Sequence, residues 1–144
     1  KDYAFIPSSG TSSYNAVNQI VMFSGVSNLR GVTYNSTTGA VTLRANKTYR
    51  VTYHIAGTLT GTGVTATTGY ISFNLVDSTG ALISNSSLSI IKPGGNYSNT
   101  HMSVMENVIT TTQNYNIRLQ VVNLSANTSF ALRNNECKVI IQEI

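Results

Sequence analysis

The sequence predicts an all-β fold, an antiparallel sandwich or jelly roll, and three observations support this class. Apolar and polar residues alternate with a period of two in several short runs. Clusters rich in Gly, Asn, Ser and Thr separate these runs at regular spacing, as turns do. No stretch shows the period of an amphipathic helix. The 144 residues are enough for one domain with its own core.

The clearest strand pair lies between Tyr34 and Gly57. A turn signal at 35–39 precedes a short alternating run at 40–45, and a polar break leads to a longer run at 48–56. In the longer run, one face carries Tyr49, Val51, Tyr53 and Ile55, and the other carries Arg50, Thr52 and His54. This alternation is typical of a strand with one face on a core, so we expect the first set to be buried.

The other elements follow from the same two signals. We expect strands at 17–23, 70–76, 81–83, 88–91, 102–110, 115–124, 130–132 and 137–144, with a hairpin turn at 77–80. Residues 1–16 are interpreted as an edge strand or a linker from an upstream segment, and 17–144 as the domain. Loops are expected at 58–68, 92–100 and 125–128. Since Lys1 is not the product of a start codon, we expect the chain to be a processed product or an excised domain.

The composition argues against several classes of partner. Charged residues make up only 10 %, and the nine Lys and Arg behind the net charge of +4 are scattered. Without a basic patch, a groove-reading helix or an aromatic and basic platform, we expect no nucleic acid partner. No run reaches the roughly 20 apolar residues of a membrane helix, so no membrane insertion is expected. Cys137 is alone and lies in an apolar run, which is typical of a buried small hydrophobe.

Apolar residues also occur on the supposed solvent face of the strands. They are Ile20, Met22, Met105, Ile109, Val122, Leu124, Ile140 and Ile144. Such residues indicate that a neighbouring subunit covers part of that face. The alternative is a one-residue shift at a bulge, which would exchange the two faces.

The residues that could perform catalysis or bind metal are few and dispersed. The acids are Asp2, Asp77, Glu106, Glu136 and Glu143, with no paired spacing, and the histidines are His54 and His101. We therefore expect no catalytic site, no cofactor and no dedicated metal site; a cation on a symmetry axis through three copies of His54 is not indicated. The sequons at Asn35, Asn46, Asn85, Asn96, Asn123 and Asn127 would matter in a secreted eukaryotic chain.

The strand pair described above resembles the globular head of the C1q branch of the C1q/tumour-necrosis-factor superfamily. The matching residues are Tyr34, Thr38-Gly39, Val41 to Leu43, Tyr49, Val51, Tyr53-His54 and Gly57. The strand, turn and long strand from 102 to 124, the run 129–132 and the apolar end look similar too, so the resemblance covers about residues 20–144. The family's Pro-Gly is Asn46-Lys47-Thr48 here, and its aromatic last strand is replaced by 137–141, as in divergent bacterial and viral members.

The resemblance implies a ten-stranded jelly roll that forms homotrimers, often on a collagen-like or coiled-coil stalk, with the inner sheet facing the threefold axis. Tyr49, Tyr53, Phe73 and Leu119 would then be core. The implied trimer interface contains Thr52, His54, Asn116, Arg118, Gln120, Val122, Lys138, Ile140 and Gln142. We expect His54 and Arg118 near the axis, and Asp at position 122 or 140 to dissociate the trimer.

The function expected from this is a non-enzymatic trimeric head on a surface or virion fibre. It would drive trimerisation and use the loops at its far end for attachment to a glycan or a protein receptor, outside a cell, spore or virion. Two alternatives remain open: a purely structural trimerisation or coat-assembly module, and a secreted receptor-binding ligand.

Overall fold

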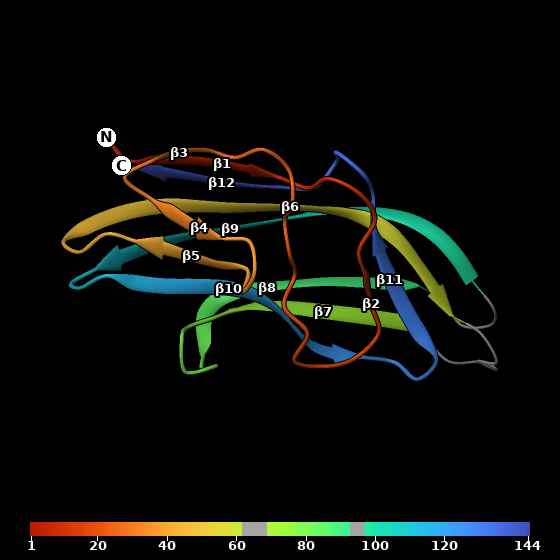
Figure 1. Cartoon of the computed structure of the whole chain (residues 1–144). Coiled ribbons are helices and arrows are strands. Elements are labelled where there is room, and N and C mark those ends of the chain that lie inside the picture. Colours follow the sequence, from red (N-terminus) through yellow and green to blue (C-terminus); the bar gives the residue numbers. More distant parts are fainter. Residues whose placement is uncertain (62–68, 93–96) are drawn as a thin grey trace.

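Two antiparallel β-sheets pack face to face in the computed structural model, which describes residues 1–61, 69–92 and 97–144 (Figure 1). The larger, seven-stranded sheet contains β1 (Tyr3–Pro7), β2 (Ser13–Tyr14), β3 (Asn28–Arg30), β6 (Lys47–Gly61), β9 (Tyr97–Thr111), β11 (Thr128–Leu132) and β12 (Lys138–Glu143). The smaller, five-stranded sheet runs in the order β4 (Thr33–Asn35), β5 (Ala40–Leu43), β10 (Tyr115–Leu124), β7 (Gly69–Val76), β8 (Leu82–Lys92).

The long strand β6 organises the larger sheet. It pairs with β9 along its whole length, from Lys47 opposite Thr111 to Gly61 opposite Tyr97. On its other side, β6 pairs first with β12 and then with β11. β1 lies between β12 and β3, and β2 pairs with β11. The expected all-β antiparallel sandwich is confirmed.

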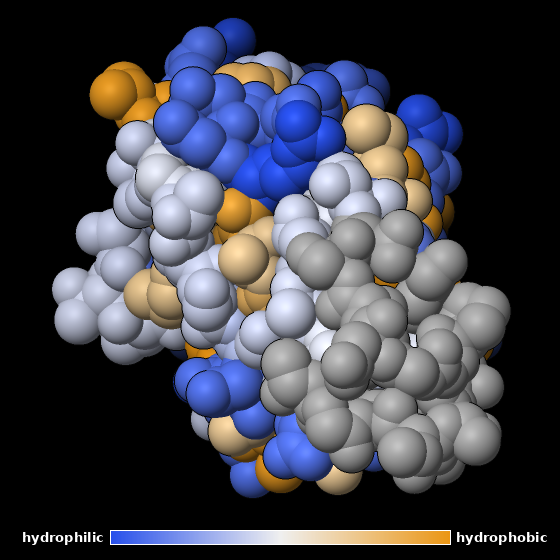
Figure 2. All heavy atoms as spheres, turned by 90° about the vertical axis from the view of Figure 1, so that its right-hand side faces the viewer, coloured by the Kyte–Doolittle hydropathy of each residue, from blue (hydrophilic) through white to orange (hydrophobic). Residues whose placement is uncertain are grey.

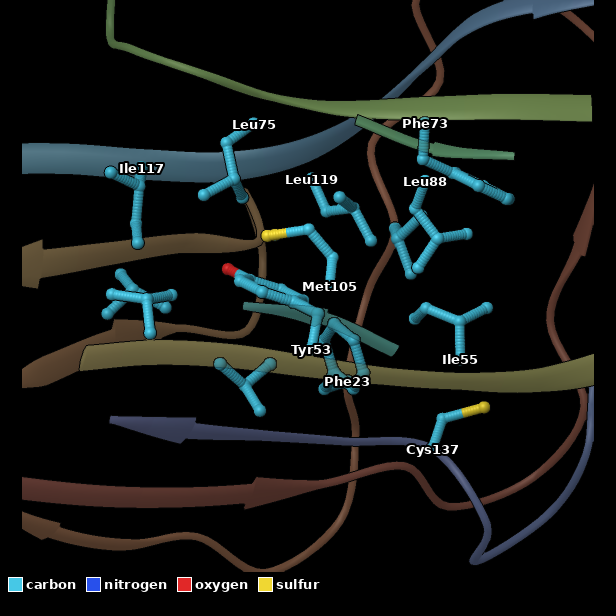
Figure 3. Packing of buried hydrophobic residues seen from close by; sticks show 14 of the residues in the cluster. Phe23, Tyr53, Ile55, Phe73, Leu75, Leu88, Met105, Ile117, Leu119 and Cys137 are labelled. Carbon is cyan, nitrogen blue, oxygen red and sulfur yellow. The ribbon is translucent and has the colours of Figure 1, made fainter. Parts of the chain in front are cut away.

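The core lies between the two sheets and contains the side chains expected there. Tyr49, Val51, Tyr53 and Ile55 of β6 are buried, because alternate side chains of this strand point towards the smaller sheet. Figure 3 shows Tyr53 and Ile55 among Phe73, Leu75, Leu88, Ile117 and Leu119, which come from β7, β8 and β10. The Phe73 and Phe130 rings lie edge to face, 5.8 Å apart, and so join the two sheets.

Several expected boundaries were wrong. Residues 17–23 form no strand: Asn18 has a positive φ, and the segment crosses the edge of β10 with one bridge, Ile20 to Gln120. The segment lies beside β10 on the same edge as β5. Its Asn18 N and Val21 N donate hydrogen bonds to the carbonyls of Val121 and Leu119. Residues 58–61 belong to β6, because β11 and β9 both hydrogen-bond to them.

The other expected loops and the first residues are placed as follows. Residues 88–91 are part of the longer β8, and 97–100 are part of β9. Residues 62–68 and 93–96 of the expected loops lie outside the described residues. In the 125–128 stretch, only 125–127 connect strands, since β11 begins at Thr128. The first 16 residues contribute β1 and β2 to the larger sheet.

Candidate assembly surface

The outward side of the larger sheet carries a row of exposed apolar side chains, and we call it the β6 face. It exists because even-numbered residues of β6, β9 and β12 point away from the core, whereas their odd-numbered neighbours are mostly buried. Strand register brings these side chains into rows. The β6 face comprises Met102, Val104, Glu106 and Val108 of β9, Arg50, Thr52 and His54 of β6, Lys138, Ile140 and Gln142 of β12, and Tyr3 and Phe5 of β1.

Exposed apolar side chains form a stripe along β9 on this face. Met102 is 73 % exposed, Val104 53 % and Val108 54 %. Ile140 and Phe5 lie opposite each other on β12 and β1 and are half-buried. One exposed apolar residue is ordinary, but a row on one strand beside further apolar residues is typical of a contact surface.

Charges on the β6 face are few and mostly paired. Arg50 Nε lies 3.6 Å from Glu106 Oε1. His54 stands between Val104 of β9 and Lys138 of β12 in the strand register. Burial lowers the pKa of His54 from its ordinary value, and the nearby Lys138 ammonium lowers it further. The middle of the face therefore favours a neutral imidazole.

The nine side chains of the predicted interface separate into two groups. Thr52, His54, Lys138, Ile140 and Gln142 lie together on the β6 face. Asn116, Arg118, Gln120 and Val122 belong to β10, in the other sheet. The inward residues of β10 are buried in the core, so Asn116, Arg118 and Gln120 point out on the opposite side of the sandwich.

The β10 group has contacts within its own layer. Asn116 Oδ1 accepts a hydrogen bond from Thr42 Oγ1 at 2.7 Å, and Arg118 Nη2 donates to the carbonyl of Asp77 at 3.2 Å. Gln120 Nε2 donates to Asn18 Oδ1 at 3.3 Å. Val122 lies at a bulge, where the β10–β7 register shifts between Val121 and Asn123. The bulge that the sequence left as an alternative is thus present in β10.

The apolar residues expected on the outward face need one correction. Met105 and Ile109 are buried in the core, because the odd-numbered residues of β9 point inward. The outward apolar residues of β9 are Met102, Val104 and Val108, which were not among the residues expected on this face. Their signal was present, because this run is apolar on both faces. Only the pairing with β6 shows which face of β9 points to the core and which points outward.

A second candidate region is a polar groove of about 550 Å³ at the turn between β10 and β11. It is lined by Asn15, Thr60, Leu124 and the residues 125–129. Ser125 Oγ and Thr128 Oγ1 lie 2.6 Å apart, so the hydroxyls of the turn hold one another. The chain ends lie at the left of Figure 1 and this turn at the right. Figure 2 looks onto the right-hand end, where pale residues of intermediate hydropathy lie between blue hydrophilic areas, with a few orange hydrophobic residues among them.

A third feature is an ion cluster where the chain ends meet. The Asp2 carboxylate is 6 % exposed; its Oδ2 accepts a 2.7 Å hydrogen bond from Tyr49 Oη and its Oδ1 lies 3.2 Å from Arg44 Nη1. Lys47 Nζ is 2.7 Å from Glu143 Oε2, and Asp2 N donates to the same oxygen at 2.7 Å. These bonds lower the pKa of Glu143 to about 2. Each group is engaged with another, so the cluster fastens β1 to β12 and β6.

Catalytic and metal-binding groups do not converge in the described ranges. His54 lies outward on β6, and His101 lies on β9 opposite Gly57. No three His, Cys, Asp or Glu side chains of residues 1–61, 69–92 and 97–144 come close enough to hold a metal ion. The same residues include no helix that is long and apolar enough to cross a bilayer. Cys137 is buried, and its Sγ accepts a 3.2 Å hydrogen bond from Ala56 N.

Comparison with known proteins identifies the fold. No protein-family model matches the sequence, and no curated protein matches it. Among solved structures, the globular domain of the zebrafish complement 1qA protein matches 100 % of this chain with 98 % of its own. The TM-score is 0.62 at 13 % sequence identity. The resemblance predicted from the sequence is confirmed at the level of the fold: this chain has a C1q-like jelly roll.

Proposed function

We propose that this domain is a non-enzymatic head that assembles into a homotrimer through the β6 face and uses its opposite end for attachment. The observation that carries the proposal is the exposed stripe of Met102, Val104 and Val108, on the sheet that the resemblance assigns to the threefold axis. Ile140 and Phe5 extend the apolar surface towards β1. A closed ring of three copies would cover this surface on every protomer. An open chain of copies would leave it uncovered on the protomer at one end.

The composition of the β6 face is suited to contact between copies. The face carries apolar side chains on β9, and on β12 and β1, to either side of the polar outward residues of β6, and interfaces commonly combine apolar and polar contacts in this way. Thr52 and Gln142 supply neutral hydrogen-bonding groups, and Arg50 already has Glu106 as its partner within the protomer. Closing the face would bury its apolar side chains and the Arg50–Glu106 pair, and the cost of desolvation would fall mainly on Lys138, which makes no ion pair among the described residues.

The attachment role is supported by the polar end of the sandwich. The groove beside residues 125–129 contains no charged group; besides Leu124 and Ala126, it is lined by hydroxyl and amide side chains. Such side chains suit the hydroxyl groups of a glycan. Each contact of this kind is weak, but three grooves held on one trimer would act together and raise the overall affinity. The location that follows is the surface of a cell, spore or virion.

The direct test of the trimer is the mass in solution at micromolar concentration. Size-exclusion chromatography with light scattering and sedimentation velocity should both give three times the protomer mass. A well-folded monomer would overturn the proposal. For attachment, the intact trimer is applied to a glycan array; selective binding supports the proposal, and a clean blank favours the purely structural module.

The face itself is tested by a pair of substitutions. Ile140→Asp places a carboxylate on the β6 face, whereas Val122→Asp makes the same kind of change on β10, on the opposite layer. Both side chains are half-buried, so each variant is first checked for its β-sheet circular dichroism. We expect Ile140→Asp to give monomers and Val122→Asp to stay trimeric. The reverse result would assign assembly to the other face.

A further inference from the structure

His54 occupies a special position on the β6 face. It lies in the middle strand of three, with the cation Lys138 directly opposite on β12 and the exposed Val104 directly opposite on β9. Cross-strand neighbours of this kind are about 5 Å apart at their Cβ atoms. A protonated His54 would therefore sit beside a lysine ammonium on one side and an apolar side chain on the other.

The acidic groups near His54 are already engaged. On β9, Glu106 faces Thr52 and pairs with Arg50, the next outward charge along β6. In the turn that leads into β12, Glu136 Oε2 lies 2.9 Å from Arg133 Nε. On β1, the residue opposite Lys138 is Pro7, which has no charge. Lys138 itself makes no ion pair among the described residues.

Closing the β6 face would increase this conflict. In the isolated protomer, water still solvates the ammonium and the imidazole, and burial with Lys138 already lowers the pKa of His54. Covering the face with a second copy removes that water, which penalises a charged imidazole more than a neutral one. In a closed trimer the arrangement occurs three times, so three imidazoles would have to remain neutral.

We infer that assembly of this domain is controlled by pH through His54, so that the trimer forms when His54 is neutral and opens when it is protonated. The inference rests on the proposed trimer. By linkage, assembly is at full strength at pH values above those where His54 of the free protomer titrates. It weakens as pH falls, because the separated protomers take up protons that the closed face excludes.

The expected effect is large because it is multiplied by symmetry. Up to three protons are taken up per trimer, so the association constant should fall by on the order of 10³-fold per pH unit at its steepest. The chain helps the test because it contains only two histidines, His54 and His101. His101 lies on β9, and its Nε2 is buried within the protomer without a hydrogen-bond partner, so His101 is not part of the β6 face and serves as the control.

The experiment measures sedimentation velocity from about pH 8 to about pH 5, the interval where histidine changes its charge. It uses wild type, His54→Gln and His101→Gln, with circular dichroism on every sample. We expect wild type and His101→Gln to dissociate on acidification with their β signal retained, and His54→Gln to stay trimeric. Lys138→Gln should reduce the extent of the dissociation, because without the neighbouring cation the closed face penalises a protonated His54 less.

Each result decides a different point. A wild type that is trimeric at about pH 8 and unchanged at about pH 5 overturns the pH control and leaves the trimer standing. Dissociation that is equal in wild type and His54→Gln also overturns it, because another group must then be responsible. A wild type that is monomeric throughout overturns the proposed function itself. Loss of the β signal together with the trimer in wild type but not in His101→Gln would assign the acid effect to His101 and refute the role of His54.

Discussion

Val104→Lys is the substitution that most directly probes the β6 face. Val104 is 53 % exposed, so the protomer should tolerate a longer side chain there with little change in its own stability. The new ammonium would lie opposite His54, with Lys138 on the far side of that histidine. In the free protomer, water solvates these charges, and the lysine stem can lie along the sheet. In a trimer they would be buried together.

The magnitude follows from the burial of this one side chain. Covering the exposed half of a valine stabilises an assembly by about 1 kcal/mol, hence by about 3 kcal/mol over three copies. Removing a lysine ammonium from water without a partner costs several kcal/mol for each copy. Even if half of that cost is relieved by tilting towards solvent, the trimer loses at least about 6 kcal/mol. This corresponds to a factor of about 10⁴ in the association constant.

The assay is sedimentation equilibrium of Val104→Lys beside a matched control, Val17→Lys. Val17 is 47 % exposed and lies before Asn18, which hydrogen-bonds to β10 in the other sheet. We expect Val104→Lys to be monomeric at concentrations where Val17→Lys and wild type are trimeric. Thermal unfolding confirms that all three protomers are folded. A trimeric Val104→Lys, or equal weakening by both substitutions, would refute the assignment of the β6 face.

The remaining predictions concern the cluster at the chain ends and its neighbours. The pKa of Glu143 is lowered to about 2 from 4.5, so its bonds should stabilise the fold above pH 4.5 and be lost as pH falls towards 2. In urea unfolding measured across that range, Glu143→Gln should show a smaller loss of stability with acid than wild type. The pKa of Tyr49 is raised to about 12 from 10.0, by burial first and then by the bond to Asp2, so the stability it brings should be held below pH 10 and lost as pH rises towards 12. Tyr49→Phe should therefore lower the stability at neutral pH by about 1 to 2 kcal/mol and reduce the loss of stability at alkaline pH. It should also remove one late-titrating phenol from the alkaline absorbance curve. An unchanged curve would contradict the burial of this phenol. Gly31 has a φ of +72° and an added Cβ would collide with the Asp2 carboxylate, so Gly31→Ala should cost over about 2 kcal/mol. Gly10→Ala is its control, since Gly10 has a φ of +81° and open space around it and should cost only about 1 kcal/mol; equal losses would show that the Asp2 contact is unimportant.

The local rules predicted most of the fold, because they operate within a few residues. The alternation in 48–56 located the core side of β6, and the turn at 77–80 located the β7–β8 hairpin. The segment at 17–23 failed because an apolar run has the same composition whether it pairs along its length or only crosses a strand edge. There Asn18 adopts a positive φ that ends any extended run. The alternation of apolar and polar residues gives no signal of that turn.

The candidate surface was only partly predictable, for a topological reason. Alternation tells which side chains of a strand share a face, but not which sheet the strand joins. β10 alternates as clearly as β6, yet it lies in the other layer, so Arg118 and His54 point in opposite directions. The same limit applies to β9, where both faces are apolar and only the register with β6 assigns Met105 inward and Val104 outward.

The abundance of asparagine acquires a structural explanation from the backbone. The non-glycine residues with positive φ in the described chain are all asparagines: Asn18, Asn46, Asn85, Asn127 and Asn135. Asparagine tolerates this conformation better than most residues, because its short side chain can hydrogen-bond to the local backbone. Asn46, Asn85 and Asn127 are also sequon positions, so backbone geometry is a sufficient reason for asparagine at these three places.

The pairing of β1 with β12 has a mechanical consequence. Residues 2 and 143 lie side by side, joined by hydrogen bonds between Asp2 and Glu143 in both directions. Tension between the two ends would therefore separate β1 from β12 step by step. It would load one hydrogen bond at a time, beginning with the bonds of Asp2. A force applied between β1 and the turn that joins β10 to β11 would instead act along the strands and strain many hydrogen bonds at once. The domain should thus be weak to a pull across its ends and strong to a pull along its length.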